Sequence, residues 1–280
     1  MAGEERTYRR WIESDPSTGL GSPRAKSRGD LRTFEVRIGE SDLLISAERP
    51  LPELAERALR LVRADLEAYL ARDSEFERTL VPREALDGAP PIVRQMAEAA
   101  RVCGVGPMAA VAGAVAQAVG EALLAAPGRG LRLPRAQSWG EARDSASSLP
   151  GSKQVIVENG GDIFLYTVRP RVAAVYAGAS PLSGKLGLKV SRLNQPLGLC
   201  TSSGTVGPSL SFGKADAAIV LAESAALADA AATALGNRVK TAHDVEPALA
   251  AVSQIPGIYG LAAIIGEHLG AWGEMEFVRL

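Results

Sequence analysis

Alternating apolar and polar positions near the start of the chain predict a β-hairpin. Phe34, Val36 and Ile38 are separated by single polar residues, which is the period of a half-buried strand. The segment 39–42 supplies turn residues, and 43–46 has the composition of a returning strand. We therefore expect the ordered part of the chain to begin with two antiparallel strands.

The next part of the chain has the periodicity of helices. From Pro52 to Tyr69, apolar residues recur every three or four positions, and a second segment of this kind spans 93–104. A third helix is predicted to start at Pro107 and is free of charged residues up to Gly120. A membrane span needs ~20 strongly apolar residues, whereas this segment is mostly Ala and Gly. We interpret it as a buried helix and expect no membrane association.

The second half of the chain mixes short β-rich runs with two further helical segments. Two such runs flank 159–162, an Asn-Gly-Gly-Asp sequence typical of a hairpin turn. Mixed helices and hairpins favour an α+β fold with a mainly antiparallel sheet packed with helices. Further strands are expected over 171–177, 186–190, 217–221, 260–265 and 274–280, and helices over 225–235 and 245–253.

Two segments depart from this pattern. Residues 1–30 are polar, mildly basic and rich in Ser, Pro and Gly near their end, so we interpret them as a mobile N-terminal arm. Residues 127–153 are rich in Gly, Arg, Ser and Pro, which predicts an exposed insertion. The remainder, 31–280, is expected to form a single domain.

Composition narrows the possible functions. The 280 residues carry 31 Lys and Arg against 32 Asp and Glu, so the chain lacks the global basicity of a nucleic-acid coat protein. Two cysteines cannot form a disulfide framework, and two histidines disfavour a histidine-built metal site. A metal would therefore be held by oxygen, which favours Mg²⁺ or Ca²⁺. The N-terminus has no apolar segment typical of a secretory signal, so we expect a cytoplasmic protein.

Two glycine-rich segments could contribute to a ligand site. In Gly104–Gly120, glycines before a helix leave N–H groups that can bind a phosphate, or they serve only close helix packing. In Val157–Asp162, three oxygen-bearing side chains surround a turn, and these bind a ligand or only stabilise the turn. Both alternatives stay open for each segment.

A polar segment, Cys200–Ala217, combines hydroxyl side chains with glycines and is interpreted as a loop. Such a loop offers N–H and O–H donors for phosphate or ribose oxygens, and Lys214 adds one positive charge. Cys200 could act as a nucleophile, but no base lies near it in the sequence, so a structural thiol is the favoured interpretation.

The segment 226–237 places Asp229 and Thr233 four residues apart on one face of a predicted helix. A carboxylate beside a hydroxyl suits a hard cation such as Mg²⁺. The alternative is a solvated Asp with a Thr that hydrogen-bonds to its own helix.

Together, GVGPMAAVAGAVA, VENGGDIF, TSSGTVGPSLSFGKADA and ADAAATALGN resemble the signatures of an uncharacterised family of bacteria and archaea. That family is allied to the FAD:protein FMN transferases, the ApbE-like proteins. The resemblance spans roughly 31–280, while the tie to the transferases themselves rests mainly on the Gly-Gly-Asp turn and the ADxxxT helix.

This resemblance implies an ApbE-like, T-fold-related single domain that binds FAD or FMN with Mg²⁺. ApbE-like transferases move FMN to a threonine of an acceptor protein, and their metal is held by the Asp and Thr of the ADxxxT helix and by a carbonyl that would lie in 106–113 here. The implied cofactor-binding residues are Gly106, Gly160, Gly161, Asp162, Ser202, Ser203, Gly204 and Thr205, and the implied metal ligands are Asp229 and Thr233.

One departure concerns catalysis. The transferases follow the Thr-Ser-Gly loop with a His and an Asp-Pro-x-Thr-Gly element, but this chain has TVGPSLSFGKADAA, and its histidines are His243 and His268. The resemblance therefore leaves two functions open: a flavin transferase, and a non-catalytic flavin-binding or assembly protein with the same pocket. An unrelated reaction at Cys200 or the hydroxyl cluster is a third, less favoured alternative. Partners expected are a nucleotide and an acceptor protein, with no nucleic acid, and a homo-oligomeric state stays open.

Overall fold

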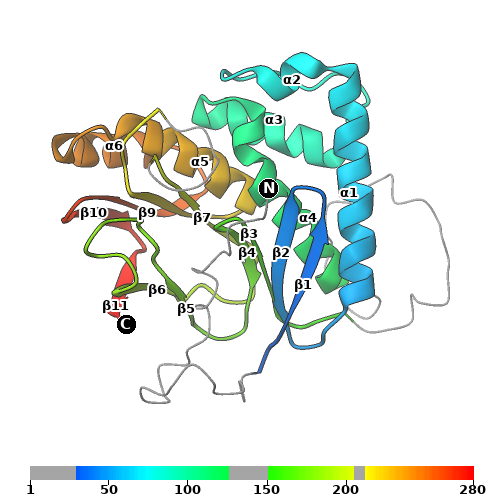
Figure 1. Ribbon diagram of the computed structural model, residues 1–280, viewed down its shortest axis with the longest axis horizontal. Coiled ribbons are helices and arrows are strands. Elements are labelled where there is room, and N and C mark those ends of the chain that lie inside the picture. The colour runs from blue at the N-terminus through cyan, green and yellow to red at the C-terminus, as the bar shows by residue number, and fades with distance from the viewer. Residues whose placement is uncertain (1–29, 126–150, 205–211) are drawn as a thin grey trace.

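A computed structural model describes residues 30–125, 151–204 and 212–280. The predicted arm, apart from its last residue, and most of the predicted insertion lie outside these ranges. The chain forms three layers (Figure 1): helices, an eight-stranded antiparallel sheet in the order β1-β2-β3-β4-β7-β8-β9-β10, and a three-stranded sheet in the order β11-β6-β5. The predicted α+β class with a mainly antiparallel sheet is confirmed.

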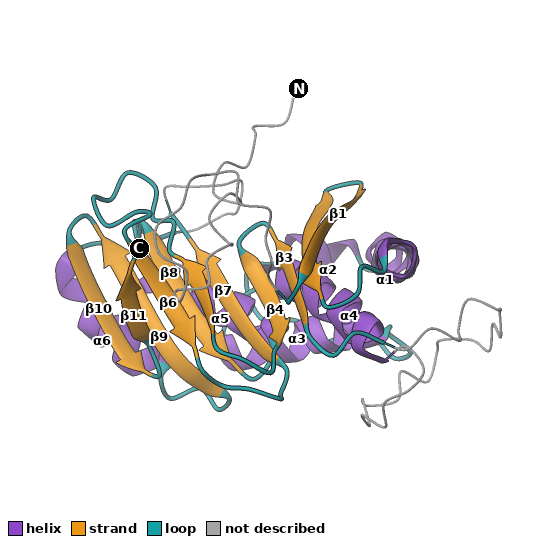
Figure 2. Ribbon diagram, turned by 90° about the horizontal axis from the view of Figure 1, so that it is seen from below, coloured by secondary structure: helices purple, strands orange, loops and turns teal. Residues whose placement is uncertain are grey.

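The strands of the large sheet come from both halves of the chain, and their neighbours pair antiparallel throughout. The helices cover one face of this sheet, and the small sheet lies against the other face (Figure 2). The strands are β1 Arg32–Ile38, β2 Ser41–Ala47, β3 Val155–Asn159, β4 Asp162–Tyr166, β5 Arg171–Ala174, β6 Leu186–Val190, β7 Leu197–Ser202, β8 Ala217–Ala222, β9 Ile258–Ile265, β10 His268–Gly273 and β11 Glu276–Arg279.

Central strand β8 shows why the sheet needs a layer on each side. Ala218, Val220 and Ala222 belong to the core beneath the helices, whereas Ile219 and Leu221 belong to the core beneath the small sheet. A strand buried on both faces has a continuous apolar sequence rather than an alternating one. This explains the AAIVLA sequence of the strand.

The helical layer is built around α4 and α5, which contact each other and the sheet. The predicted helix from Pro107 starts as the 3₁₀ helix η2 before it becomes α4. The helices are α1 Pro52–Arg72, α2 Ser74–Arg78, α3 Pro91–Cys103, η2 Pro107–Ala110, α4 Val111–Ala125, α5 Ala225–Arg238, η4 Ala242–Asp244 and α6 Val245–Val252.

Close packing explains the small residues of α4. A methyl group added to Gly113 would overlap the carbonyl of Ala225 at the start of α5, and one added to Gly120 would overlap the ring of Phe164 on β4. Within the described ranges, one helical segment, Pro107–Leu124, is long and apolar enough to cross a membrane, but 61% of it is buried in the protein. The buried helix that we expected here is confirmed.

Two strands and a short helix were not anticipated from the sequence. Cys200–Ser202, interpreted above as the start of a loop, instead ends strand β7. The strand was missed because Gly198 and Cys200 alternate with leucines, so the pattern lacks large apolar residues on one face. Gly198 is required there because a side chain would overlap the backbone at the start of α5. Strand β10 is largely exposed, and helix α2 has five residues, so neither has a strong hydrophobic pattern.

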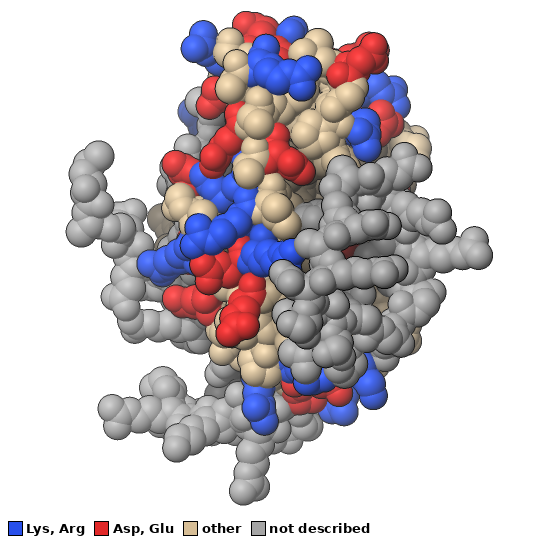
Figure 3. Space-filling view, turned by 90° about the vertical axis from the view of Figure 1, so that its right-hand side faces the viewer, with Lys and Arg blue, Asp and Glu red and all other residues tan. Residues whose placement is uncertain are grey.

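The outward face of the molecule over α1 carries charges of both signs (Figure 3). Arg60 pairs with Glu56 along the helix, and Arg63 pairs with Glu67 and with Glu40 of the β1–β2 turn. Exposed pairs of this kind stabilise by only ~0.2–1 kcal/mol each. They make this face a solvated surface and tie the hairpin weakly to α1.

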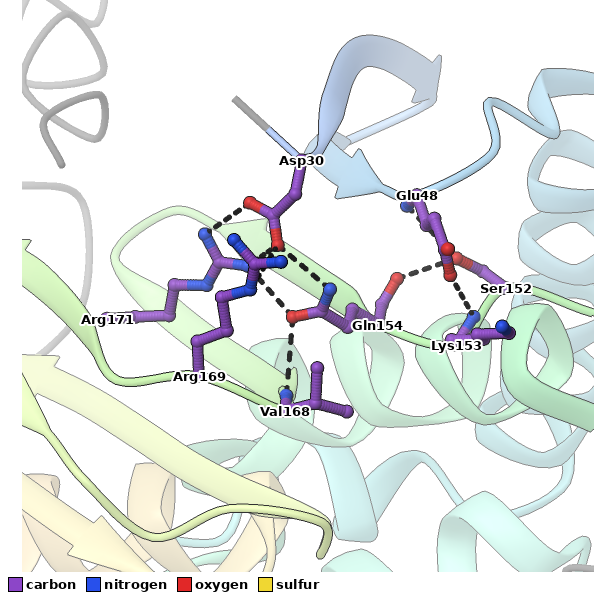
Figure 4. A network of polar contacts seen from close by, with 8 residues as sticks. All are labelled: Asp30, Glu48, Ser152, Lys153, Gln154, Val168, Arg169 and Arg171. Atoms are coloured by element: carbon purple, nitrogen blue, oxygen red, sulfur yellow. Dashed lines mark hydrogen bonds and ion pairs between the residues drawn. The ribbon is translucent and has the colours of Figure 1, made fainter. Parts of the chain in front are cut away.

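Asp30, the last residue of the predicted arm, takes part in a network of polar contacts (Figure 4). Its carboxylate accepts hydrogen bonds from Arg171 at 2.7 and 2.9 Å and from the buried Gln154 at 2.9 Å. Arg171 in turn donates to Gln154, and Ser152, within the predicted insertion, is fully buried beside them and donates to the Gln154 carbonyl. This network joins the segments just before β1 and β3 of the large sheet to the first residue of β5 in the small sheet.

Replacing Asp30 with Asn should destabilise the protein by about 1 kcal/mol at pH 7, less than the full linkage value because solvent screens the pair. Hydrogen bonds from Arg171 lower the pKa of Asp30 to about 2. Because the pKa of Asp30 is lower in the folded state, its ionised carboxylate stabilises the folded protein at pH values above the ordinary pKa of 3.8. This stabilisation is lost as the pH falls through about 2. Urea unfolding of wild type, Asp30→Asn and the exposed control Asp65→Asn between pH 7 and 2 would measure it. A difference that persists unchanged at pH 2 would contradict this origin.

Candidate functional site

The turn between β3 and β4 meets the first turn of α4 and the middle of α5 on the helix-covered face of the large sheet. Asn159 donates from Nδ2 to the Ala112 carbonyl at 3.1 Å. The Gly113 N–H donates to Asp229 Oδ2 at 2.9 Å. The structure therefore brings three of the predicted segments to one place, although they are far apart in the sequence.

Asp229 satisfies N–H groups that the first turn of α4 leaves without helical partners. Its half-buried carboxylate interacts with the N–H groups of Gly113 and Ala112. Burial raises the pKa of Asp229 to about 7, although these N–H groups oppose the rise. The solvated aspartate that formed the alternative interpretation above is not what the structure shows, because this side chain links α5 to α4.

Thr233 lies one turn after Asp229 on the same helix and is half-buried. Within the described ranges its hydroxyl makes no hydrogen bond, so the bond to its own helix that formed part of the alternative interpretation is absent. The hydroxyl, one turn from the half-buried Asp229 carboxylate, remains available for a ligand.

Asp162 is the first residue of β4 and is buried, with an exposed fraction of 8%. It lies on the same face of the strand as Phe164, which belongs to the core beneath the helices. Among the described residues, its Oδ1 atom has no hydrogen-bond partner. Burial and, next, the neighbouring charge of Asp229 raise the pKa of Asp162 well above its usual value.

Cys200 is buried next to this carboxylate pair on β7. Its thiol donates to the Ala225 carbonyl at 3.4 Å and also interacts with Asp162. Burial, followed by the charges of Asp162 and Asp229, raises the pKa of Cys200 well above its usual value. A thiol held in its protonated form is a poor nucleophile, which supports the structural role.

The Gly-Gly turn and the end of β7 are adjacent. Gly161 has φ +104°, a conformation that favours glycine, and the position of an added Cβ would be 3.9 Å from the Thr201 carbonyl. The Gly161 N–H donates to the buried Glu158 at 2.8 Å. Gly204 continues from β7 and donates its N–H to Ala215 at 2.9 Å.

The remaining predicted residues divide into two groups. Ser202 is buried in β7, where it pairs with β8, and Ser203 is half-buried just beyond it. Thr205 lies outside the described residues. Gly106 packs against the backbone of Thr79, where any side chain would overlap it, so close packing accounts for this glycine, and its cofactor role stays a prediction.

Gln117 is a site-supporting residue that the sequence analysis missed. Its Oε1 accepts from the Ala225 N–H at 2.9 Å, and its Nε2 donates to Glu121 at 2.8 Å. It thereby holds the N-terminus of α5 against α4. The available signal was a pair of polar residues, Gln117 and Glu121, four positions apart inside an otherwise apolar helix.

The donors at this junction fit a hard divalent cation. They are two carboxylates, one of which has an unpartnered buried oxygen, and one hydroxyl, all of which are oxygen ligands. The described part of the chain contains no group of three or more His, Cys, Asp and Glu residues able to hold a metal. A cation here would therefore depend on a bound ligand for further oxygen atoms.

Two other features lie away from this junction. Surface clefts of about 400 and 360 Å³ run along α1 and beside β6, respectively. His243 in η4 and His268 in β10 are both exposed. Neither histidine is on the strands or helices that position Asp162 and Asp229.

Comparison with known proteins identifies the family. A model of the family described as "AbpE bacteria" matches residues 24–131 and 142–254. The chain belongs to this family. The gap between the two matched ranges, 132–141, falls inside the predicted insertion.

Relatives of this AbpE-family chain occur in archaea. A UPF0280 protein from Methanocella arvoryzae is 39% identical over 244 residues, covering 87% of this chain and 89% of the relative. A UPF0280 protein from Methanosarcina acetivorans is 41% identical over 244 residues, covering 86% of each. These matches confirm the resemblance to an uncharacterised family of bacteria and archaea.

A solved structure shares the fold of the AbpE-family chain. The flavin transferase ApbE from Vibrio cholerae superposes with a TM-score of 0.53 at 11% identity, covering 86% of this chain and 96% of that one. At this identity the similarity establishes the fold. The predicted alliance with the ApbE proteins is thus confirmed at the level of architecture.

The stabilising effect of Asp229 relative to Asn should decrease as the pH rises. Because the pKa of Asp229 is higher in the folded state, its protonated form stabilises the folded protein fully below the ordinary pKa of 3.8. This contribution is lost as the pH rises through about 7. Denaturant unfolding of wild type and Asp229→Asn without added metal should show their difference falling by more than about 1 kcal/mol between pH 4 and 8. Asn keeps an acceptor for Gly113, so a pH-independent difference would show that the carboxylate is not held against ionisation.

Proposed function

We propose that this AbpE-family protein binds a flavin nucleotide, FAD or FMN, together with Mg²⁺ at the junction of the β3–β4 turn, α4 and α5. The observation that carries the proposal is the pair formed by the buried Asp162 and the half-buried Asp229, because the Asp229 charge raises the pKa of Asp162 when no cation is present. Carboxylates with strongly shifted pKa values cluster at functional sites. The fold shared with a flavin transferase supports the flavin as the ligand.

Each part of the junction has a role in this proposal. Asp229 and Thr233 hold the cation, which neutralises the phosphate charge of the nucleotide. The Gly160–Gly161 turn and the Ser202–Gly204 segment lie side by side and offer backbone and hydroxyl donors. Asn159 and Gln117 position these groups by fixing α4 to the sheet and to α5.

Flavin binding should require both the cation and Asp229. We expect FAD fluorescence to change on titration with the full chain and Mg²⁺, and the affinity to fall at least ~10-fold in EDTA or in Asp229→Asn. Asp65→Asn, which removes an exposed charge on α1, serves as the matched control. Equal affinities of wild type and Asp229→Asn for FAD would show that Asp229 does not hold the cation, and no binding at all would refute the proposed function.

Transfer of FMN to a protein threonine should be weak or absent. Activation of an acceptor hydroxyl needs a general base, whose loss typically lowers rates ~10²–10⁴-fold, and both histidines of the chain lie on elements away from the junction. This favours a flavin-binding or assembly protein over a transferase. Incubation with FAD, Mg²⁺ and a transferase substrate, followed by mass spectrometry, tests this. Covalent flavin formed at the rate of a His-bearing transferase would contradict the prediction.

A further inference from the structure

We propose that Asp162 is a second carboxylate ligand of the cation at Asp229, so that the ion is held between the first residue of β4 and the middle of α5. This inference rests on the proposed function and adds a residue to it. The Gly-Gly-Asp turn then serves the cation directly, through Asp162, and not only the nucleotide.

The position of Asp162 follows from the alternation of side chains along β4. Phe164 and Tyr166 face the helices, and Asp162 has the same parity, so its side chain enters the layer that contains α4 and α5. The pairing of Ile163 with Leu199 sets β7 beside it and places Cys200 next to Asp162. The carboxylate is therefore enclosed by β7 on one side and by the helices above it.

The two oxygens of Asp162 have different surroundings. The carboxylate interacts with the Cys200 thiol and the Thr201 N–H, whereas Oδ1 has no partner among the described residues. A buried carboxylate oxygen without a partner is destabilising. A buried acceptor atom that has no partner and lies beside a second carboxylate indicates a ligand position.

The charge at this position favours a cation over a hydrogen-bond donor of the nucleotide. Helix α5, which carries Asp229, contacts β4, which begins with Asp162, and the charges of Asp229 and the buried Glu158 both act on Asp162. Among the described residues, no Lys or Arg side chain is a partner of either carboxylate. A divalent cation satisfies Oδ1 and balances Asp162 and Asp229 together, whereas a neutral donor would leave both charges uncompensated.

The test measures metal binding without flavin. Mn²⁺ binding to the full chain is followed by the loss of the free-ion EPR signal, in wild type, Asp162→Asn, Asp229→Asn and the control Asp65→Asn. We expect each site variant to bind Mn²⁺ roughly 10–100-fold more weakly than wild type, and the control to bind unchanged. Thermal unfolding without metal should show Asp162→Asn at least as stable as wild type, because Asn removes one of two neighbouring carboxylates whose negative charges repel each other.

The outcomes separate this inference from the function on which it rests. If Asp229→Asn weakens Mn²⁺ binding and Asp162→Asn does not, the inference is wrong and the cation site at Asp229 stands. If Asp162→Asn weakens FAD binding in EDTA but not Mn²⁺ binding, Asp162 contacts the nucleotide instead, and the inference is again wrong. If wild type binds no Mn²⁺, both the role of Asp162 as a ligand and the cation site at Asp229 are wrong. FAD fluorescence then decides separately whether the protein binds a flavin.

Discussion

The hydrogen bond from Gly113 to Asp229 joins the two helices that cover the centre of the large sheet. It requires close approach, because any side chain at Gly113 would overlap the first carbonyl of α5. It also requires the first turn of α4 to be held in place, and Asn159 does this from the end of β3. Gln117 repeats the arrangement one turn later by accepting from the start of α5. These side-chain bonds fix the β3–β4 turn, α4 and α5 as one unit.

The same unit contains two neighbouring carboxylates, Asp162 and Asp229, whose repulsion is not needed for the packing of the helices on the sheet. Asp162 is buried and Asp229 is half-buried between the sheet and the helices, where ionised carboxylates are disfavoured. Apolar residues of similar size would give a more stable core, so a carboxylate pair in a well-packed layer is typical of a functional site. The proposed cation relieves this repulsion by supplying positive charge where the described residues supply none.

Binding and group transfer make separate demands on such a site. Holding a nucleotide needs donors and a neutralised phosphate, and in the proposed function these are the backbone N–H groups, hydroxyls and oxygen ligands at the ends of β3, β4 and β7 and on α5. Transfer further needs a base beside the acceptor hydroxyl. The histidines of this chain are exposed on η4 and β10, and the sequence after Gly204 contains no Asp-Pro element. The proposed binding therefore does not depend on the residues that transfer needs.

The sequence alone determined features that depend on local patterning. The period of α1, the β1–β2 hairpin and the Asn-Gly-Gly-Asp turn were all predictable, because burial of one face and a positive φ restrict the residue types allowed. Strand β7 was not, because its small residues are explained only by the backbone of α5 lying against Gly198. The unpartnered oxygen of Asp162 and the capping role of Asp229 also emerged only from the tertiary structure. Both depend on contacts between segments more than 60 residues apart, which no local pattern encodes.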